Sequence, residues 1–451
     1  MAKYKAYPEY KDSGVEWLGE IPKHWVCTVL KRLCSLTTGL TPPTNNEDNY
    51  ADEGHPWVRP EDINENGMET RASKYVSNNG WKLLRNIEPN STLLCCIGTI
   101  GKCGYVREIV STNQQITAAT FRNSERFNFY LMQSARTQLE ELATGNVLKI
   151  LNSERLGTLN VVKVEGKEAD TIAAFLDHET AKIDKLIEKQ QQLIELLKEK
   201  RQAVISHAVT KGLNPDVPMK DSGVEWLGEV PAHWKVAPLK HLCSLIKDGT
   251  HLPPPRVDKG VPLLSVRNII NGKFNFRDDD SQISYKDYKS LCSSFIPKKD
   301  DVLLAIVGAT LGKVALVPEM ESFHIQRSLG VFRTNELVQS QQLSYIFESK
   351  NFQNLLWGNV GFSAQPGIYL GTLANFSIPV PPINEQTKII EFISNAVNKL
   401  DHLLAQTAQF TSLMQERRTA LISAAVTGKI DVRDWVAPEA REVEVLQEVT
   451  A

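Results

Sequence analysis

The sequence has no surplus of positive charge and no long apolar run. It contains 51 Lys and Arg against 53 Asp and Glu, a formal net charge of −2 over 451 residues. A strongly basic balance would indicate a nucleic-acid partner, so composition gives no support for one, although a neutral total is compatible with a local basic face. Charges interrupt the aliphatic runs before they reach the roughly 18–20 apolar residues that a membrane span needs.

The chain also lacks the marks of secretion and of a disulfide or zinc framework. Its first segment, MAKYKAYPEYKD, has no apolar core of the kind found in signal peptides. The seven cysteines are odd in number and form no C-x-x-C pair, which argues against zinc or redox sites. We therefore expect a cytoplasmic protein with buried, reduced thiols that does not engage a membrane. The length is enough for several domains.

Motifs of catalysis are missing as well. GATLGKV at 308–314 has three residues between its glycines and Val after the Lys, whereas a phosphate-binding loop needs four and then Ser or Thr. The segments TPPT (41–44), LPPPR (252–256) and VPPIN (380–384) lack the flanks with which amino-methyltransferases hold a flipped base. We find no nucleophile elbow, no dinucleotide-binding glycine loop and no metal-spaced histidine cluster. The sequence therefore predicts a non-enzyme with no catalytic residue, metal or cofactor.

What the sequence does contain is one long phrase that occurs twice. DSGVEWLGEIPKHW at 12–25 returns as DSGVEWLGEVPAHW at 221–234, and 19 of 26 positions are identical between 11–36 and 220–245. Shorter matches follow in the same order, namely GNV at 145 and 358, LGTL at 156 and 370, and AVT at 208 and 425. The chain is therefore one repeat of about 210 residues used twice.

Each repeat divides into a β-rich part and a helical part. Short strands between Gly, Pro and Asn turns are expected in the first part, with strand-turn-strand pairs at 91–106 and 301–317 and short helices at 127–143 and 339–356. The segments 168–209 and 385–426 contain no Pro or Gly and show helical periodicity, which predicts two long helices. Asn384 is the expected N-cap of the second helix, and Gly212 and Gly428 the expected C-terminal caps.

A heptad-like seam is predicted on both long helices. Its positions are Ile172, Leu176, Ile183, Leu186, Leu193, Leu197 and Val204, and, 217 residues later, Ile389, Ile393, Leu400, Leu403, Phe410, Met414 and Leu421. Polar Gln190 and Thr407 fall at equivalent seam positions. Two stripes in one register favour an antiparallel coiled coil between the helices. The alternative is that each stripe is buried on its own globular domain.

The predicted fold class is α+β, with two β-rich domains related by pseudo-two-fold symmetry and separated by the helix pair. We expect the first domain at 1–166, the first spacer helix at 167–211, and a linker with the second domain at 212–383. The second spacer helix is expected at 384–428 and a peripheral acidic tail at 429–451. His24 and His233 are expected to be structural rather than catalytic.

At this point the chain resembles a known family. The phrase DSGVEWLGEIPKHW, the L..G..G strand-turn, GNV…LGTL before the helix, and IPVPPINEQTKIIEFI at 378–393 are similar to the specificity subunits of type I restriction-modification systems. The resemblance covers nearly the whole chain, although 162–176 lacks the proline-rich helix entry seen at 379–386. It implies a non-catalytic subunit whose two target-recognition domains each read half of a bipartite, asymmetric double-stranded DNA site.

The resemblance also implies partners. The helices would set the gap between half-sites and dock two adenine-N6 methyltransferase subunits, and a helicase-nuclease restriction subunit can join them. The outer faces of the helices and the repeated phrases, with Trp17, Trp25, Trp226 and Trp234, are the candidate docking surfaces. Burial of these tryptophans in the protein's own core is the alternative.

Candidate DNA contacts are polar side chains in the segments where the two repeats differ or turn sharply, because base edges and phosphates are contacted by such groups. The candidates of the first domain are Thr41, Arg59, Arg71, Lys74, Lys102 and Gln115, and those of the second are Thr250, His251, Arg256, Arg267, Lys273, Lys313 and Gln326. For each one the alternative is an ordinary solvated surface residue.

Two other functions remain open from the sequence. One is the specificity subunit of a methyltransferase-only or type II-like system, which the neighbouring genes would distinguish. The other is an adaptor that bridges two protein partners without DNA, which the near-neutral charge leaves open and which DNA binding by the assembled complex would exclude.

Overall fold

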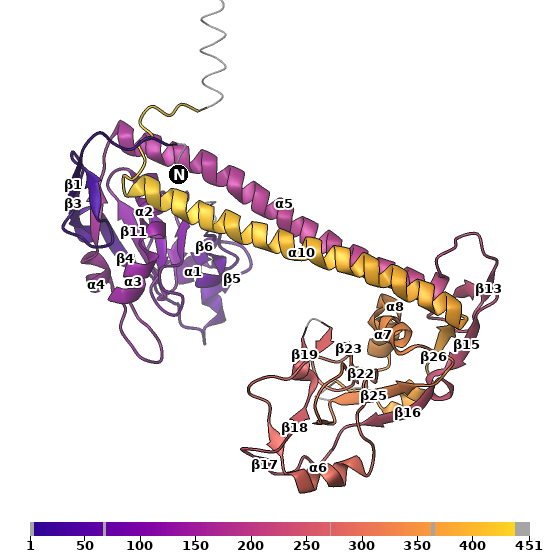
Figure 1. Ribbon diagram of the computed structural model, residues 1–451. Coiled ribbons are helices and arrows are strands. Elements are labelled where there is room, and N and C mark those ends of the chain that lie inside the picture. The colour runs from indigo at the N-terminus through magenta and orange to yellow at the C-terminus, as the bar shows by residue number, and fades with distance from the viewer. Residues whose placement is uncertain (1–3, 66–68, 271, 362–365, 438–451) are drawn as a thin grey trace, which may run out of the picture. The chain divides into compact units, whose positions relative to one another are not determined.

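The computed structural model describes residues 4–65, 69–270, 272–361 and 366–437 (Figure 1). The chain divides into two compact units. Unit 1 comprises residues 1–191 and 408–451, and unit 2 comprises residues 192–407. Each unit therefore combines one β-rich domain with half of each long helix. Within the described ranges, none of the helices has the length and apolarity that a membrane crossing requires.

Unit 1 contains a four-stranded antiparallel sheet in the order β4-β11-β8-β9 and a second four-stranded sheet, of shorter strands, in the order β10-β6-β7-β5, in which β10 and β6 are parallel. Two-stranded pairs form between β1 and β2 and between β3 and β12. The strands of unit 1 are β1 (Tyr10–Asp12), β2 (Glu20–Pro22), β3 (Val26–Val29), β4 (Cys34–Thr38), β5 (Tyr50–Ala51), β6 (His55–Val58), β7 (Tyr75–Val76), β8 (Thr92–Cys95), β9 (Cys103–Tyr105), β10 (Ser111–Thr112), β11 (Ile116–Phe121) and β12 (Asn160–Lys163).

Unit 2 repeats this topology and adds two strands to the first sheet. Its larger sheet has the order β16-β25-β22-β23-β20-β19, and its smaller sheet has the order β17-β21-β18-β24, with β18 and β24 parallel. Pairs also form between β13 and β14 and between β15 and β26. The strands are β13 (Met219–Asp221), β14 (Glu229–Pro231), β15 (Lys235–Pro238), β16 (Cys243–Asp248), β17 (Arg256–Val257), β18 (Val261–Leu264), β19 (Ile269–Ile270), β20 (Lys273–Phe274), β21 (Gln282–Ile283), β22 (Val302–Ala305), β23 (Val314–Leu316), β24 (His324–Ile325), β25 (Leu329–Thr334) and β26 (Ser377–Val380).

Both predicted strand-turn-strand pairs are confirmed as β8–β9 and β22–β23. The two predicted short helices are each divided in two. The α-helices are α1 (Asn78–Trp81), α2 (Glu125–Ser134), α3 (Arg136–Leu142), α4 (Ser153–Gly157), α5 (Lys167–Lys211), α6 (Tyr285–Cys292), α7 (Ser340–Glu348), α8 (Lys350–Gly358), α9 (Leu370–Ala374) and α10 (Ile383–Val426). Short 3-10 turns η1 (Leu30–Arg32), η2 (Glu47–Asn49), η3 (Pro60–Asp62), η4 (Leu239–His241) and η5 (Val266–Asn268) connect strands.

The two long helices of Figure 1, α5 and α10, confirm the helical prediction for 168–209 and 385–426. Asn384 is not the N-cap, because α10 begins at Ile383 and Asn384 is already its second residue. Gly212 and Gly428 follow the last turns with φ of +78° and +73°, left-handed values that glycine adopts without strain.

The predicted seam is only partly correct. Leu186, Leu193, Leu403 and Phe410 are 40 to 46% exposed instead of buried. The positions that alternate in steps of four and three and are at least half-buried are Ile183, Ile187, Gln190, Ile194, Leu197, Arg201 and Val204 of α5, and Leu400, Leu404, Thr407, Thr411, Met414, Arg418 and Leu421 of α10. The apolar stripe at 186 and 193 therefore faces solvent, one residue away from the buried one.

An ion pair joins the two long helices inside each unit. In unit 1 the Arg418 guanidinium lies 2.8 Å from the Asp184 carboxylate, and in unit 2 Arg201 lies 3.1 Å from Asp401. The two pairs are equivalent under the repeat, because 184 + 217 = 401 and 201 + 217 = 418. Burial raises the pKa of the Asp184 carboxyl, and the Arg418 charge acts in the opposite direction. The partly buried acid therefore depends on its arginine.

The repeated phrase connects the ends of the long helices to each domain. In unit 1 the Glu168 carboxylate, in the first turn of α5, accepts hydrogen bonds from Tyr7 Oη and Trp25 Nε1 at 2.9 and 3.0 Å. His24 Nε2 lies 2.8 Å from the same carboxylate. The end of α10 reaches the same place, because a Cβ on Gly428 would lie 3.2 Å from the Trp25 ring. One tryptophan thus contacts the start of one long helix and the end of the other.

Unit 2 repeats this junction with the helices exchanged. His233 Nε2 lies 2.7 Å from Glu385, in the first turn of α10, and Trp234 is buried. A Cβ on Gly212, at the end of α5, would lie 3.1 Å from the Trp234 ring. Trp25 and Trp234 are therefore core residues, and the expectation that their side chains dock a methyltransferase is wrong.

The segment after α10 is not peripheral as far as it is described. Ile430 and Val432 are 3 and 4% exposed and belong to the unit 1 core, and Asp431 N donates to Lys5 O at 2.7 Å. The tail prediction is thus wrong for this part, and the rest of the predicted tail, 438–451, lies outside the described residues.

Candidate nucleic-acid interface

The candidate residues of the first domain converge on one edge of its two sheets. This edge, here called loop edge 1, comprises the segments Gly39–Thr41, Arg59–Asp62, Ile97–Lys102 and Asn113–Gln115. It forms because β4, β6, β8 and β10 all end there, while β9 and β11 begin there. Backbone bonds join the segments, since Leu40 N donates to Thr112 O and Asn113 N to Val58 O.

Five of the six candidates in the first domain lie at or beside loop edge 1. Thr41 Oγ1 donates to Gln114, and Lys102 Nζ donates to Pro60 O at 2.9 Å, beside Arg59. Lys74 immediately precedes β7, and its carbonyl accepts from Trp57 N. Gln115 immediately precedes β11. Arg71 lies between Glu69, which pairs with Tyr105 at the far end of β9, and Ser73, which donates to Asp62 of loop edge 1.

The second domain has an equivalent edge, loop edge 2, formed by Gly249–His251, Ser265–Asn268, Val307–Lys313 and Gln326–Ser328. Thr250, His251, Arg267, Lys313 and Gln326 are brought together there, and Thr250 forms an isolated bridge with Gln326. Two candidates are not. Lys273 pairs with Leu316, at the end of β23 opposite to Lys313. Arg256 lies on β17, the outer strand of the smaller sheet, and pairs with Ile283 of β21.

Acidic neighbours neutralise several of the candidate cations. The Arg59 guanidinium lies 2.7 Å from Glu61, and Arg267 lies 3.0 Å from Asp279. Arg71 also has a carboxylate partner, Glu69, and His251 Nε2 lies 2.6 Å from the Asp248 carboxylate. Arginines fixed in this way present oriented N–H groups rather than free charge, a property that suits base edges more than phosphates.

Lys102 and Lys313 occupy the same turn position in the two domains. Each precedes the second strand of a pair, β9 or β23, and each carbonyl accepts from the end of the first strand at 2.8 to 2.9 Å. The other polar residues of the two edges are not equivalent in place, because Thr250 occupies the position of Leu40 and Gln326 that of Asn113. The loop edges therefore share this lysine, whereas the arginine segments at 59 and 267 differ.

Metal-ligating side chains and cysteines are two further groups whose chemistry the structure describes. Three or more metal-ligating side chains do not gather anywhere in the described part of the chain. Burial raises the pKa of Cys95 to about 11 and that of Cys34 to about 12, so neither thiol is a nucleophile near neutral pH. All seven cysteines are free; Cys34, Cys95, Cys96 and Cys103 are buried as predicted, whereas Cys27, Cys243 and Cys292 are only partly buried.

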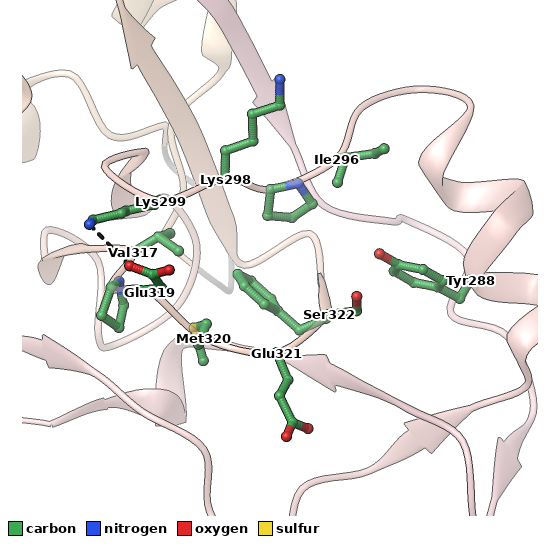
Figure 2. Close-up of a pocket in the computed structure, with 12 residues that line it drawn as sticks. Tyr288, Ile296, Lys298, Lys299, Val317, Glu319, Met320, Glu321 and Ser322 are labelled. Carbon is green, nitrogen blue, oxygen red and sulfur yellow. Dashed lines mark hydrogen bonds and ion pairs between the residues drawn. The ribbon is translucent and has the colours of Figure 1, made fainter.

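A recess of 210 Å³ in unit 2 is separate from loop edge 2. Figure 2 shows it between Tyr288 of α6 and the segment that follows β23, with the Lys299 ammonium bound to Glu319 at 3.2 Å. Because this segment leaves the far end of β23, the recess lies at the opposite edge of the sheet from Lys313. It is therefore not part of the candidate interface.

Sequence reasoning missed Glu168 and Glu385, which hold the repeated phrases to the long helices. Both are acids in the first helical turn, and 168 + 217 = 385. The repeat could therefore have identified them before the structure was known. Gln114, the partner of Thr41, has no such signal, because its bond depends on how two loops meet.

Comparisons with known proteins agree with this architecture. The family model "Type I restriction modification DNA specificity domain" matches twice, at residues 22–196 and 231–409. The EcoBI specificity subunit of Escherichia coli is 20% identical over 95% of this chain and 91% of its own length. The MjaVIII specificity subunit of Methanocaldococcus jannaschii is 23% identical over 80% of this chain and 84% of its own length.

One solved structure has the same fold over most of the chain. It comes from work on complex assembly and conformational transition of the type I R-M system, and it aligns with a TM-score of 0.68 at 14% identity. The alignment covers 90% of this chain and 98% of that one.

Proposed function

This chain belongs to the family of type I restriction-modification DNA specificity proteins, and we propose that each of its two recognition domains reads one half of a bipartite, asymmetric DNA site through its loop edge. The observation that carries the proposal is the convergence of Thr41, Lys102 and Gln115 at loop edge 1 and of Thr250, Lys313 and Gln326 at loop edge 2. A shared fold thus brings polar side chains together at one place in each domain.

The shared and the divergent residues have different roles in this proposal. Contacts to phosphates position a protein on any duplex, whereas contacts to base edges carry the sequence information. The matched lysines, Lys102 and Lys313, suit phosphates, and the unmatched segments around Arg59 and Arg267 suit bases. Two nearly equivalent domains can then recognise two different half-sites.

The long helices have the role of a spacer in this proposal. α5 and α10 are 45 and 44 residues long, which corresponds to roughly 65 Å of helix at ~1.5 Å per residue. Each is one uninterrupted element with its two halves in different units. The equivalent Asp184–Arg418 and Asp401–Arg201 pairs support an antiparallel coiled coil with the same register in both units. The domain limits given above are part of this proposal.

Exposed apolar residues on the helices support the docking of two methyltransferase subunits. In unit 1 these are Leu186 and Leu413, and in unit 2 their equivalents are Leu403 and Leu196, all 43 to 61% exposed. Equivalent apolar surfaces suit two copies of one partner. We propose adenine-N6 methyltransferase subunits for these positions, with restriction subunits added in a complete complex.

Methylome sequencing of a host that expresses this chain with its methyltransferase tests the function directly. The expected result is N6-methyladenine on both strands of a single bipartite motif. Exchanging residues 37–121 for those of a relative with another specificity should change only one half of that motif. Methylation without a bipartite motif, or a change in both halves, would contradict the assignment of one half-site to each domain.

Lys102→Ala is expected to weaken DNA binding by the complex to a similar degree on all sequences. Loss of one phosphate contact should reduce the slope of log affinity against log salt by about 1. Lys23→Ala is the matched control, because Lys23 lies in the repeated phrase and pairs with Glu9. Equal salt slopes for wild type and Lys102→Ala, measured by fluorescence anisotropy, would remove Lys102 from the interface.

A further inference from the structure

The loop between α3 and α4 in unit 1 presents bare apolar side chains to solvent. Val147 is 102% exposed, so it touches nothing in the protein, and Leu148 and Ile150 are 52 and 44% exposed. In Figure 1 the chain between these two helices extends away from the body of the unit. Apolar groups at the tip of a loop cost free energy in water, and such exposure commonly marks a contact surface.

The loop is held in one shape. Thr144 N donates to Ile150 O at 2.9 Å, and Ile150 N donates to Thr144 O at 2.8 Å, which closes the loop at its base. Gly145 has a φ of +114°, and a Cβ there would lie 2.2 Å from Leu148 O. The tip is therefore displayed by a defined backbone that only glycine permits at this position.

Backbone bonds place this loop against loop edge 1. Gly98 N donates to Lys149 O at 3.4 Å, and Leu151 N donates to Cys96 O at 2.8 Å. Cys96 N in turn donates to Gln115 O at 2.8 Å. The apolar tip is thus attached to the same strand ends that carry Gln115 and Lys102.

The second domain anchors its corresponding loop in the same way. Gly308 N donates to Pro366 O at 2.7 Å, and Ile368 N donates to Ile306 O at 3.0 Å. Both domains, although their surface sequences differ, therefore bond this loop to the same strand ends beside loop edge 1 or loop edge 2. The attachment belongs to the shared scaffold rather than to one domain's specificity.

We propose that the loop Thr144–Ile150 is a wedge that inserts the side chains of Val147 and Leu148 between stacked base pairs of the half-site read by the first domain. This rests on the proposed function, because it requires DNA to lie on loop edge 1. Proteins insert apolar side chains between base steps and recover the cost of unstacking through the contacts that the distorted duplex allows. Lys149 follows Leu148 in the loop, and Lys102 lies in the turn to which the loop is bonded, so both would neutralise phosphates near the opened step.

The test uses the complete complex of this chain with its methyltransferase and its cognate duplex. One probe carries 2-aminopurine, which fluoresces when unstacked, in the first half-site, and a second probe carries it in the other. The double variant Val147→Ser, Leu148→Ser should lower the affinity of the complex by on the order of tenfold. It should reduce the fluorescence gain of the probe labelled in the first half-site and leave that of the other probe unchanged. A mismatch at the opened step should restore most of the affinity, because a mismatched pair costs less to unstack.

Three further variants make the result specific. Gly145→Ala keeps every apolar atom but cannot keep the backbone, and it should behave like the double serine variant. Val147→Ile keeps the apolar tip and should behave like wild type. Ile109→Ser, 49% exposed and located beyond the far end of β9, should also leave unstacking and affinity unchanged.

The outcomes separate the wedge from the proposed function. A wild-type complex without sequence-specific binding would overturn both. Specific wild-type binding with unchanged affinity and fluorescence in the double variant would overturn the wedge alone. Loss of the methyltransferase from the complex of the double variant would also overturn it, because the loop would then be a protein contact.

Discussion

Insertion of one base pair between the two half-sites is expected to lower the affinity of the assembled complex by on the order of 10³-fold or more, since only one domain can then bind specifically. One pair adds ~3.4 Å of rise and turns the second half-site by roughly 35° about the duplex axis. Two uninterrupted helices joined by the Asp184–Arg418 and Asp401–Arg201 pairs, which we propose as a rigid spacer, leave no segment that could absorb such a change.

A probe with one full helical turn added to the gap is the informative control. It restores the angular phase of the half-sites but separates them by a further ~34 Å. A complex with a rigid spacer should bind both probes weakly. A complex with flexibly tethered domains should bind both with nearly the affinity of the native site. Normal affinity for either probe in a gel-shift titration at fixed salt would therefore contradict the spacer role.

The long helices could be predicted from sequence, but the face that they bury could not be predicted completely. Leu186 stands beside Ile187, and Leu193 beside Ile194, so two apolar stripes one residue apart are available. The buried stripe contains Arg201 and Arg418, and a pattern of apolar residues alone does not select positions occupied by arginine. Their carboxylate partners lie on the other helix, some 200 positions away in the chain, so only tertiary structure reveals that the charges are paired.

The candidate interface shows the same division between local and tertiary information. The strand-turn-strand pairs that carry Lys102 and Lys313 follow from short apolar runs and glycines. That Gln115 lies beside the loop containing Val147 depends on Cys96, which joins the two by backbone bonds, and no local pattern encodes this contact. Lys273 and Arg256 have the same residue types as the other candidates, but the fold places both away from loop edge 2.

Replacement of Trp25 by alanine is expected to destabilise unit 1 by ~3–5 kcal/mol, because the indole is 2% exposed and the site cannot collapse around its loss. The centroids of the Trp25 and Phe127 rings lie 6.2 Å apart, and Trp25 Nε1 donates to Glu168. At ~2–4 °C per kcal/mol for a domain of this size, the calorimetric transition should fall by roughly 6–20 °C. Trp357→Ala removes a ring that is 46% exposed, so it should cost well under half as much.

A matched pair of glycines tests the contact between that tryptophan and the end of α10. Gly428 and Gly14 have φ of +73° and +68°, so alanine brings the same backbone strain to both, about 1 kcal/mol. Only at Gly428 does the new Cβ meet an obstacle, at 2.2 Å from Pro22 Cδ and 3.2 Å from the Trp25 ring, while nothing lies within 4 Å at Gly14. Gly428→Ala should therefore lower the transition temperature much further than Gly14→Ala. Equal shifts would mean that the end of α10 does not pack on the repeated phrase. The junction would then contribute nothing to the attachment of the second long helix to the first domain.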